Sequence, residues 1–285
     1  MRSGEGATAS RLRGHELSAT DVTVAYDGVD VVHGAAVDLR PGEVTVLVGP
    51  NGSGKSTLLR AVARLQRARG GALRIDTDTD GLALTAREFS RYVSLLTQGR
   101  PTPSGLTVRD VVEFGRYPYR GRWGRSDPDG PAAVDRALSL TGVTELAGRG
   151  ADHLSGGQLQ RVWLASCLAQ ETGVLLLDEP TTYLDLRYQV ELLDLVRDLA
   201  DDHGIAVGVV LHDLDQAAAV ADRIALLRAG RIVAEGVPED VLTPERLTDV
   251  YGIRIDVDTD PLTGRLRTRP IGRHHTRRER LGTTS

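Results

Sequence analysis

One glycine-rich segment, GPNGSGKST at residues 49–57, constrains the fold more than any other part of the chain. A short apolar stretch, VTVLVG (44–49), precedes it, and a segment with helical spacing, STLLRAVARLQ (56–66), follows it. Glycines in such a turn let successive backbone amides point inward around an anion, and the helix adds the positive end of its dipole. A glycine turn without a ligand is the alternative, which the flanking strand and helix disfavour. The segment therefore predicts a strand–loop–helix unit that holds phosphate.

The composition of the chain sets the lysine of this segment apart. Of the 35 basic residues, Lys55 is the only lysine, and all the others are arginine. A codon preference explains the arginines but not the exception, whereas a compact ammonium suits a tight loop better than a planar guanidinium does. We expect Lys55 to reach the β and γ phosphates of a nucleotide, and the Ser56 hydroxyl to ligate Mg²⁺. The other residues expected to bind the nucleotide here are Gly49, Pro50, Asn51, Gly52, Ser53, Gly54 and Thr57.

A second segment, GVLLLDEPT, ends an apolar stretch with two acids, Asp178 and Glu179. Open α/β sheets bind ligands at the carboxyl ends of their strands, where these acids would lie. We expect Asp178 to help hold Mg²⁺ from its outer coordination sphere, and Glu179 to polarise a water for in-line attack on the γ phosphate. Solvation alone would explain such a pair in isolation. With the phosphate-binding segment in the same chain, the pair predicts phosphoryl transfer to water.

Three further residues have both a structural and a functional interpretation. His212 ends the apolar stretch VVLHD, and a lone histidine in that place is usually just packed. Gln98 ends YVSLLTQ, where its amide could orient a water or cap a loop. Tyr26 lies upstream of the phosphate-binding segment, where its ring could stack on adenine or belong to the core.

The segment HLSGGQLQRVWLAS (153–166) predicts a second anion site. Ser155 has the properties of a helix N-cap, and Gly156 and Gly157 leave the amides of the first turn uncovered, with Gln158 next in the chain. The N-terminus of such a helix favours an anion. The chain thus contains two predicted phosphate sites, and the residues alone do not say whose phosphate the second one holds.

Strand and helix patterns alternate through most of the chain and predict an α/β fold. Antiparallel strands are expected within 17–39, and a hairpin over 224–236 turns at Ala229 and Gly230. Strands alternating with helices imply a mostly parallel sheet that is covered on both faces. The composition changes over residues 99–157 to Pro-, Gly- and Arg-rich segments with helical pieces between them. We interpret these residues as an inserted helical subdomain. Further strands are expected at 92–98, 173–179 and 205–213, and further helices at 156–170, 187–202 and 214–222.

The two ends of the chain differ from this pattern. Residues 1–14 are rich in Gly, Ser, Ala and Arg and suggest a flexible tail. Residues 265–285 hold seven arginines and are interpreted as a basic, solvated tail rather than a nucleic-acid arm. The domain between them would span 15–264.

Overall composition excludes several classes of protein. The formal net charge of −4 is mild, so no nucleic-acid partner is expected. No apolar run approaches the roughly 20 residues of a membrane span, and the N-terminus has no secretory signal. The single cysteine, Cys167, excludes an internal disulfide. These features predict a soluble, cytoplasmic type of protein.

Taken together, these motifs resemble one family, the ATP-binding subunits of ABC transporters, over about residues 15 to 255. The resemblance is carried by the phosphate loop 49–57, Gln98 in the Q-loop, the signature LSGGQ 154–158, VLLLDEP 174–180, TTYLD 181–185 of the D-loop and His212 of the H-loop. It implies a P-loop NTPase (RecA-like) core with an antiparallel β subdomain and the inserted helical subdomain. It also implies the cofactors ATP and Mg²⁺, with Gln98 as a metal ligand and, with His212, a participant in catalysis.

The resemblance also answers the question of the second phosphate site. In this family two chains sandwich two ATP molecules head to tail, so the signature of one chain covers the phosphate held by the other. Ser155, Gly156, Gly157 and Gln158 would therefore serve the nucleotide of a second copy of this chain. Asp185 of the D-loop would lie at the same seam and link the two sites.

The inserted region narrows the resemblance further. The stretch LTVRDVVEFGRYPYRGRWGR is similar to that of importers of ferric siderophores, haem and cobalamin. This implies a multi-span permease as partner, an extracytoplasmic substrate-binding protein acting indirectly, and a peripheral position on the cytoplasmic face of the cell membrane. A soluble ABC ATPase of the iron–sulfur cluster assembly type is the alternative. The six arginines from Arg100 to Arg125 form either a solvated face or a surface near the permease.

Overall fold

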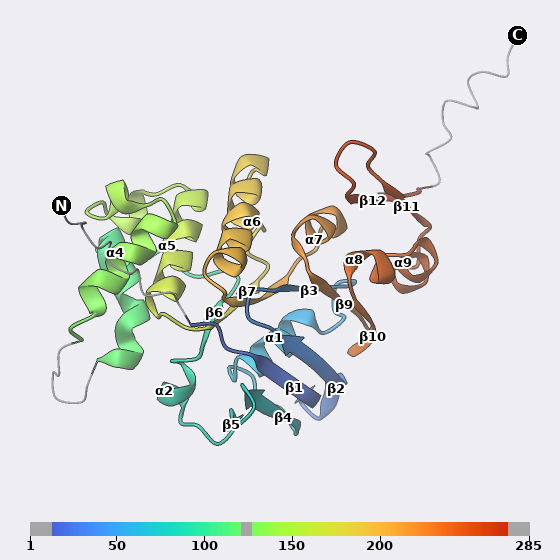
Figure 1. Cartoon of the computed structure of the whole chain (residues 1–285), viewed down its shortest axis with the longest axis horizontal. Helices are drawn as coiled ribbons and strands as arrows, with labels where there is room; N and C mark the ends of the chain where they lie inside the picture. The colour runs from blue at the N-terminus through green and yellow to red at the C-terminus, as the bar shows by residue number, and fades with distance from the viewer. Residues whose placement is uncertain (1–12, 121–126, 273–285) are drawn as a thin grey trace, which may run out of the picture.

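The larger of two main β-sheets forms the centre of the molecule (Figure 1). The computed structural model describes residues 13–120 and 127–272. The six strands of this sheet lie in the order β10-β9-β3-β8-β7-β6, and all neighbours are parallel except the β9–β10 hairpin. This confirms the predicted mostly parallel sheet. Its strands are β3 (Val44–Val48), β6 (Val93–Leu96), β7 (Val174–Asp178), β8 (Ala206–Val210), β9 (Arg223–Arg228) and β10 (Arg231–Gly236).

The sequences of the central strands explain why they are buried on both faces. Every residue of β3, β7 and β8 is buried, and these strands read VTVLV, VLLLD and AVGVV. Near-continuous apolar runs are typical of parallel strands with helices on both sides. Side chains alternate between the faces, so neighbouring residues such as Val46 and Leu47 belong to different core clusters.

Different elements cover the two faces of the larger sheet. The face of Val46 packs with helices that include α5 (Gly156–Ala169), α6 (Leu186–Asp201) and α7 (Leu214–Val220). The face of Leu47 packs with α1 (Lys55–Val62) and with a four-stranded antiparallel sheet in the order β2-β1-β4-β5. The strands of that sheet are β1 (Leu17–Tyr26), β2 (Val29–Leu39), β4 (Gly70–Ile75) and β5 (Thr79–Asp80).

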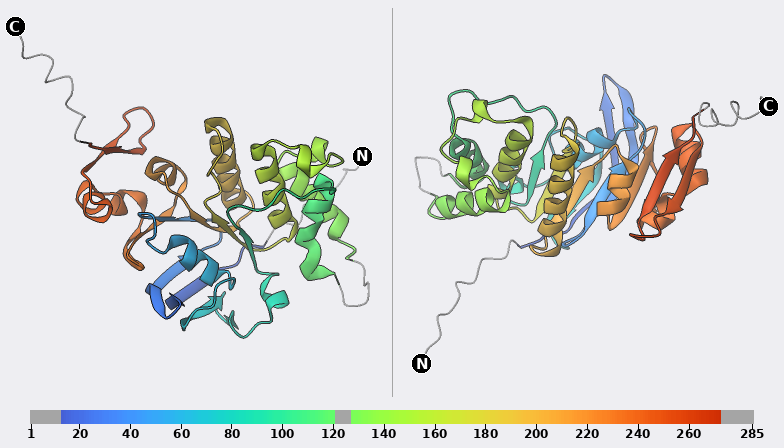
Figure 2. Two further views of the ribbon diagram at one scale, coloured as in Figure 1. Left: turned by 180° about the vertical axis from the view of Figure 1, so that it is seen from behind. Right: turned by 90° about the horizontal axis from the view of Figure 1, so that it is seen from above.

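A helical region is inserted between β6 and β7, as expected from the texture of 99–157. It contains α3 (Val108–Glu113), the 3-10 helix η1 (Phe114–Tyr119), α4 (Gly130–Leu140), the 3-10 turns η2 (Thr144–Leu146) and η3 (Ala151–His153), and the start of α5. Another short helix, α2 (Ala86–Phe89), lies before β6. Figures 1 and 2 place this helical region at the opposite end of the molecule from the C-terminal elements.

The described arginines from Arg100 to Arg125 in the inserted region form ion pairs and hydrogen bonds with other residues of this chain. Arg116 is 3% exposed and pairs with Asp127 at 2.7 Å and with Glu171 at 2.8 Å. Arg100 donates to the Leu95 carbonyl at 2.8 Å and lies over the Trp163 ring, while Arg109 and Arg120 pair with Asp135 and Glu113. The remaining two arginines, Arg122 and Arg125, lie outside the described residues. Arg109 and Arg120 stay partly exposed, as a solvated face would have them, whereas neither interpretation expected the buried ion pairs of Arg116.

The C-terminal part corrects the expected start of a tail at residue 265. After α8 (Pro238–Val241) and α9 (Pro244–Tyr251), the strands β11 (Ile255–Thr259) and β12 (Leu266–Pro270) pair as an antiparallel hairpin. Asp260, 3% exposed, accepts the backbone N–H groups of Leu262 and Thr263 and closes the turn. The arginines of β12 gave this strand the composition of a solvated tail. Residues 273–285, and residues 1–12 of the expected N-terminal tail, lie outside the described part of the chain.

Candidate functional site

The phosphate-binding segment joins β3 to α1 as a tight loop, and α1 begins at Lys55. Gly49 has φ 145°, and a Cβ atom there would come within 2.2 Å of the Leu227 carbonyl oxygen. Gly54, at φ 100°, is the N-cap of α1. Only glycine tolerates both positions, and the loop thereby ends at the positive end of the helix dipole, as the predicted phosphate site requires.

Lys55 is held inside this loop by backbone carbonyls. Its Nζ donates to the Gly49 oxygen at 2.8 Å and to the Pro50 oxygen at 3.0 Å, and the residue is 4% exposed. Burial lowers the pKa of Lys55, although the nearby charges of Glu179 and Asp178 act in the opposite direction. An anion such as a phosphate would stabilise this buried ammonium more strongly than one on the surface, because the low local dielectric strengthens the attraction between the two charges.

An open cavity of about 350 Å³ lies over the loop and joins residues from distant parts of the chain. Its lining residues are Asn51, Gly52, Gly54, Lys55, Ser56, Thr57, Glu179 and His212. Eight of the expected site residues therefore meet at one place. Tyr26, by contrast, ends β1, is 42% exposed and does not line this cavity.

Glu179 is the most constrained residue of the site. It follows β7 directly and has φ 53°, a left-handed conformation that costs a residue other than glycine roughly 1–3 kcal/mol. Gln98 Nε2 donates to Glu179 Oε2 at 2.8 Å, and His212 Nε2 lies 2.6 Å from Glu179 Oε1. These three residues follow β6, β7 and β8, which are neighbouring parallel strands, so their carboxyl ends bring the side chains together. The arrangement holds one carboxylate in a fixed direction beside the phosphate loop, as a general base requires.

Asp178 is buried, and only one of its two carboxylate oxygens accepts hydrogen bonds. Arg60 of α1 donates to Asp178 Oδ2 from Nε at 3.1 Å and from Nη2 at 2.8 Å. The second oxygen, Oδ1, is buried and has no hydrogen-bond partner among the described residues. Sequence analysis missed Arg60, because nothing in the local pattern of α1 points to a partner 118 residues away.

The residues near Asp178 fit a magnesium ion. Mg²⁺ prefers oxygen ligands and keeps several waters, and it is usually bound through one or two protein groups together with substrate phosphates. The free Oδ1 of Asp178 and the Ser56 hydroxyl at the cavity offer such oxygens. The described residues contain no group of three or more His, Cys, Asp or Glu side chains placed to bind a metal by themselves.

The signature turn, residues 154–158, lies apart from the phosphate loop and leads into α5. Ser155 caps α5 in a reciprocal arrangement, because its Oγ accepts from Gln158 N at 3.3 Å while Gln158 Oε1 accepts from Ser155 N at 3.1 Å. A Cβ atom at Gly156 would meet nothing within 4 Å, so the first turn is open to solvent there. None of these residues lines the cavity over the phosphate loop.

Asp185 lies at the start of the next helix. It caps α6 by accepting from Tyr188 N at 3.0 Å, and it is exposed. Tyr183 and Leu186, on either side of it, are 94% and 76% exposed. The D-loop therefore presents apolar side chains to the outside together with the cap of α6.

Comparison with known proteins agrees with this geometry. The family model described as ABC transporter matches residues 32–182. The ferric enterobactin transport ATP-binding protein FepC of Escherichia coli is 40% identical over 269 residues, which is 93% of this chain and 96% of FepC. This chain belongs to the ABC transporter family.

Solved structures of the family share the fold. A metal-chelate type ABC transporter in an inward-facing conformation matches with a TM-score of 0.79 and 26% identity, over 91% of this chain and 98% of that one. The dimeric structure of MJ0796, a bacterial ABC transporter cassette, matches with a TM-score of 0.68 and 27% identity, over 78% and 98% of the two chains. The predicted P-loop NTPase core with its antiparallel β subdomain and helical region is confirmed.

Membership of the family defines the activity in general terms. ABC cassettes bind ATP and hydrolyse it to power transport, and this chain is such an ATPase. Neither the family match nor the relatives support the alternative of a soluble iron–sulfur cluster assembly ATPase. Among residues 13–120 and 127–272, no helix combines the length and the apolar character needed to cross a bilayer.

Proposed function

We propose that this chain is the ATP-hydrolysing subunit of an importer whose cargo is a ferric siderophore. The observation that carries the hydrolytic part is the Glu179 carboxylate, fixed by Gln98 and His212 beside the phosphate loop. The cargo is supported by the similarity to FepC over nearly the whole of both chains. It is supported as well by the GRYPY stretch of the inserted region, which begins one residue into η1.

The residues of the cavity divide the work of hydrolysis between them. The loop from Gly49 to Thr57 holds the phosphates through its amides, and Lys55 adds a positive charge at the β and γ phosphates. Tyr26, half-exposed at the end of β1, is the proposed contact for adenine. Glu179 then polarises a water for in-line attack, because both of its oxygens are held by neighbours that keep it directed.

Ser56, Gln98 and Asp178 are the proposed magnesium site. Mg²⁺, when bound, neutralises charge on the β and γ phosphates. Ser56 and Gln98 would contact it directly, and Asp178 would act from its outer coordination sphere through Oδ1. Arg60 keeps Asp178 directed, since its guanidinium donates two hydrogen bonds to Oδ2 and balances the charge of the buried carboxylate.

Two copies are proposed to associate head to tail. Ser155, Gly156, Gly157 and Gln158 would complete the phosphate site of the partner, and Asp185 would lie at the seam. The open surface at Gly156 and the absence of the signature turn from the chain's own cavity support this arrangement. The similarity to the dimeric MJ0796 cassette also supports it.

The remaining partners follow from the proposed transport role. A multi-span permease would carry the cargo, and an extracytoplasmic substrate-binding protein would deliver it. The chain would then lie on the cytoplasmic face of the cell membrane as a peripheral subunit.

Uptake by membrane vesicles tests the proposal. The chain is reconstituted with the permease that copurifies with it, and uptake of a radiolabelled ferric siderophore is followed with and without ATP. We expect ATP-dependent uptake that is lost in a matched preparation carrying Glu179→Gln. Uptake of haem or cobalamin instead would change the cargo but not the mechanism. Normal function in cells lacking every candidate permease would contradict the transport role.

A further inference from the structure

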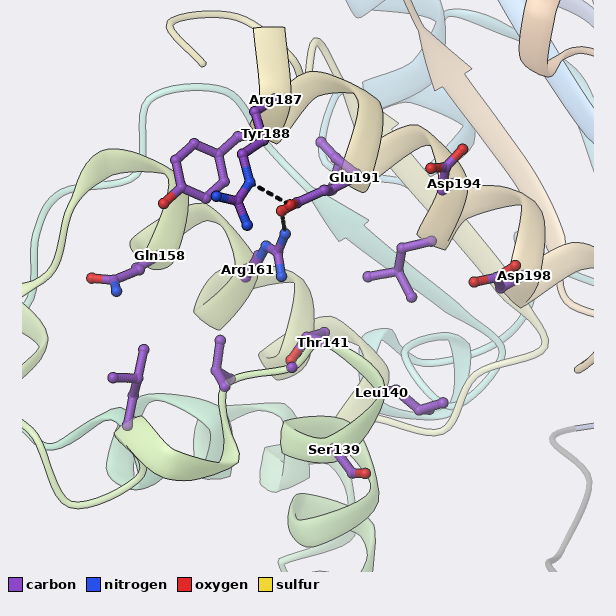
Figure 3. A pocket seen from close by; sticks show the side chains of 15 residues that line it. Ser139, Leu140, Thr141, Gln158, Arg161, Arg187, Tyr188, Glu191, Asp194 and Asp198 are labelled. Carbon is purple, nitrogen blue, oxygen red and sulfur yellow. Dashed lines mark hydrogen bonds and ion pairs between the residues drawn. The ribbon is translucent and has the colours of Figure 1, made fainter. Parts of the chain in front are cut away.

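A second cavity, of about 510 Å³, separates the C-terminal end of α4 and the signature helix α5 from α6 (Figure 3). The signature residue Gln158 lines it, as do Arg161 of α5 and Glu191 of α6. Open space rather than packed side chains fills this region, so few contacts join α5 directly to α6 across it.

Arg161 of α5 contacts Glu191 and Tyr188 of α6 across the cavity, and Arg187 of α6 adds a second ion pair to Glu191. Glu191 Oε2 pairs with Arg161 of α5, while its Oε1 accepts from Arg187 Nε at 2.7 Å. Figure 3 shows both guanidinium groups directed at this carboxylate, with the Tyr188 ring beside them. Arg161 Cζ lies 5.7 Å from the centroid of that ring. The side chains of Arg161 and Glu191 are only 24% and 32% exposed, so their pair is less screened than an ordinary surface ion pair.

The ring of Tyr188 also explains one of the signature glycines. A Cβ atom at position 157 would lie 2.8 Å from the Tyr188 ring, so the ring packs directly on the Gly157 backbone. Gly157 and Arg161 are four residues apart on α5, and Tyr188 and Glu191 are three apart on α6, which places each pair on one face of its helix. The two glycines of the signature therefore differ, because Gly156 is open to the outside and Gly157 is closed by α6.

The same tyrosine belongs to the D-loop cap. Its backbone N–H donates to Asp185 Oδ1 at 3.0 Å, so Tyr188 contacts the signature turn with its side chain and Asp185 with its main chain. One residue thus joins two segments that the proposed dimer would bring to a second copy.

We propose that Tyr188, Arg161 and Glu191 are positioning residues that fix the signature turn relative to Asp185. The signature turn and the D-loop are then presented to the second copy as one rigid surface. This inference rests on the proposed head-to-tail dimer, in which the signature turn serves the partner's nucleotide.

ATP-driven dimerisation of the full chain tests the inference. The parent carries Glu179→Gln so that bound ATP persists, and dimerisation is measured by sedimentation over a range of chain concentrations. We expect Glu191→Gln to raise the concentration needed for dimerisation about tenfold, the scale of one charge-assisted hydrogen bond. Asp194→Asn is the matched control, since Asp194 lies on the same helix and cavity without an ion pair among the described residues, and it should behave as the parent.

Two further measurements separate positioning from general damage. The affinity of the monomer for a fluorescent ATP analogue should stay within about twofold of the parent, because a tenfold change would require about 1.4 kcal/mol at a site these side chains do not touch. Tyr188→Phe keeps the ring and should dimerise as the parent, whereas Tyr188→Ala should not. Arg161→Met combined with Glu191→Gln should cost no more than either change alone.

Three outcomes of these experiments would overturn the inference. Dimerisation of Glu191→Gln and Tyr188→Ala equal to that of the parent would overturn the inference while leaving the dimer intact. A loss of monomer ATP binding in Glu191→Gln would replace positioning by a general structural role. Failure of the parent itself to dimerise with ATP would overturn the proposed dimer, and the inference with it.

Discussion

At the scale of single residues, the backbone of Glu179 connects geometry to chemistry most directly. A left-handed glutamate at the end of a buried strand is unfavourable, and Gln98 and His212 hold it there. The sequence predicted Glu179 from the end of its apolar strand, whereas Gln98 and His212 had both a structural and a functional interpretation, and only the family resemblance favoured the functional one. Sequence reasoning could not identify Arg60, whose role depends on contact with a residue far away in the chain.

Replacing Glu179 by glutamine should abolish hydrolysis but not binding. The amide keeps the shape of the side chain and loses the basic oxygen, so ATP turnover should fall about 10²–10⁴-fold. Steady-state ATPase activity of the chain in complex with its permease measures this, and calorimetry of ATP binding provides the control. Activity near that of the unmodified chain would show that another group activates the water.

Lys55→Arg should prevent ATP binding although the charge is kept. Lys55 Nζ is held between two backbone carbonyls in a buried loop, and a planar guanidinium is too wide for that position. We expect affinity for ATP to fall at least about tenfold by calorimetry. An unchanged affinity would mean that charge alone matters at this position.

The pKa of Lys55 adds a pH dependence to the same site. Burial lowers this pKa below 10.5, so the ammonium loses its proton at a lower pH than a free lysine does. The affinity of the unmodified chain for ATP should therefore decline as pH rises toward 10.5. A decline that begins only above that value would contradict the shift.

At the scale of helices and strands, apolar runs were the reliable signal. The strands β3, β7 and β8 are apolar throughout and were predicted close to their observed bounds. The hairpin of β11 and β12 was missed, because exposed and polar residues are frequent in both strands and the arginines of β12 resemble those of a solvated tail. The hairpin is held in place by contacts with distant parts of the chain, such as α7, and no local sequence pattern predicts them.

One such contact gives a test at this scale. Asp215, in the first turn of α7, accepts from both the N–H and the Oγ1 of Thr268 in β12, each at 2.7 Å. Thr268→Val keeps the shape and the backbone bond but removes the hydroxyl, at a cost of about 1.5–3 kcal/mol for a bond to a charged group. Hydrogen exchange of the β12 amides should accelerate.

Thr263→Val is the control for this experiment, because the Thr263 hydroxyl accepts from Arg265 N within the same hairpin and its loss should leave the Asp215 contact intact. If the β12 amides exchange at the same rate in Thr268→Val and in the unmodified chain, pairing with β11 alone keeps β12 ordered and the predicted role of the Asp215 contact is contradicted.

At the scale of the whole molecule, the two predicted phosphate sites of the chain lie apart from each other. The phosphate loop and Glu179 share one cavity, while the signature turn lies apart from it and opens outward at Gly156. Residues alone predicted both sites, but only the resemblance to a family assigned the second one to a partner chain. A single chain cannot reveal that assignment by itself, because in the proposed dimer the surface of the partner is part of the site.

Mixed dimers measure this central claim most directly. One chain carries Ser155→Arg and the other Lys55→Ala, both in a Glu179→Gln background that retains ATP. Each homodimer then has two damaged sites, since Ser155→Arg obstructs the partner's phosphate and Lys55→Ala disables the chain's own loop. In the mixed dimer one site takes its loop from the Ser155→Arg chain and its signature from the Lys55→Ala chain, and is intact. The account predicts about one trapped ATP per mixed dimer and none in either homodimer. Verified mixed dimers that trap no ATP would contradict it and assign the signature turn to the nucleotide of its own chain.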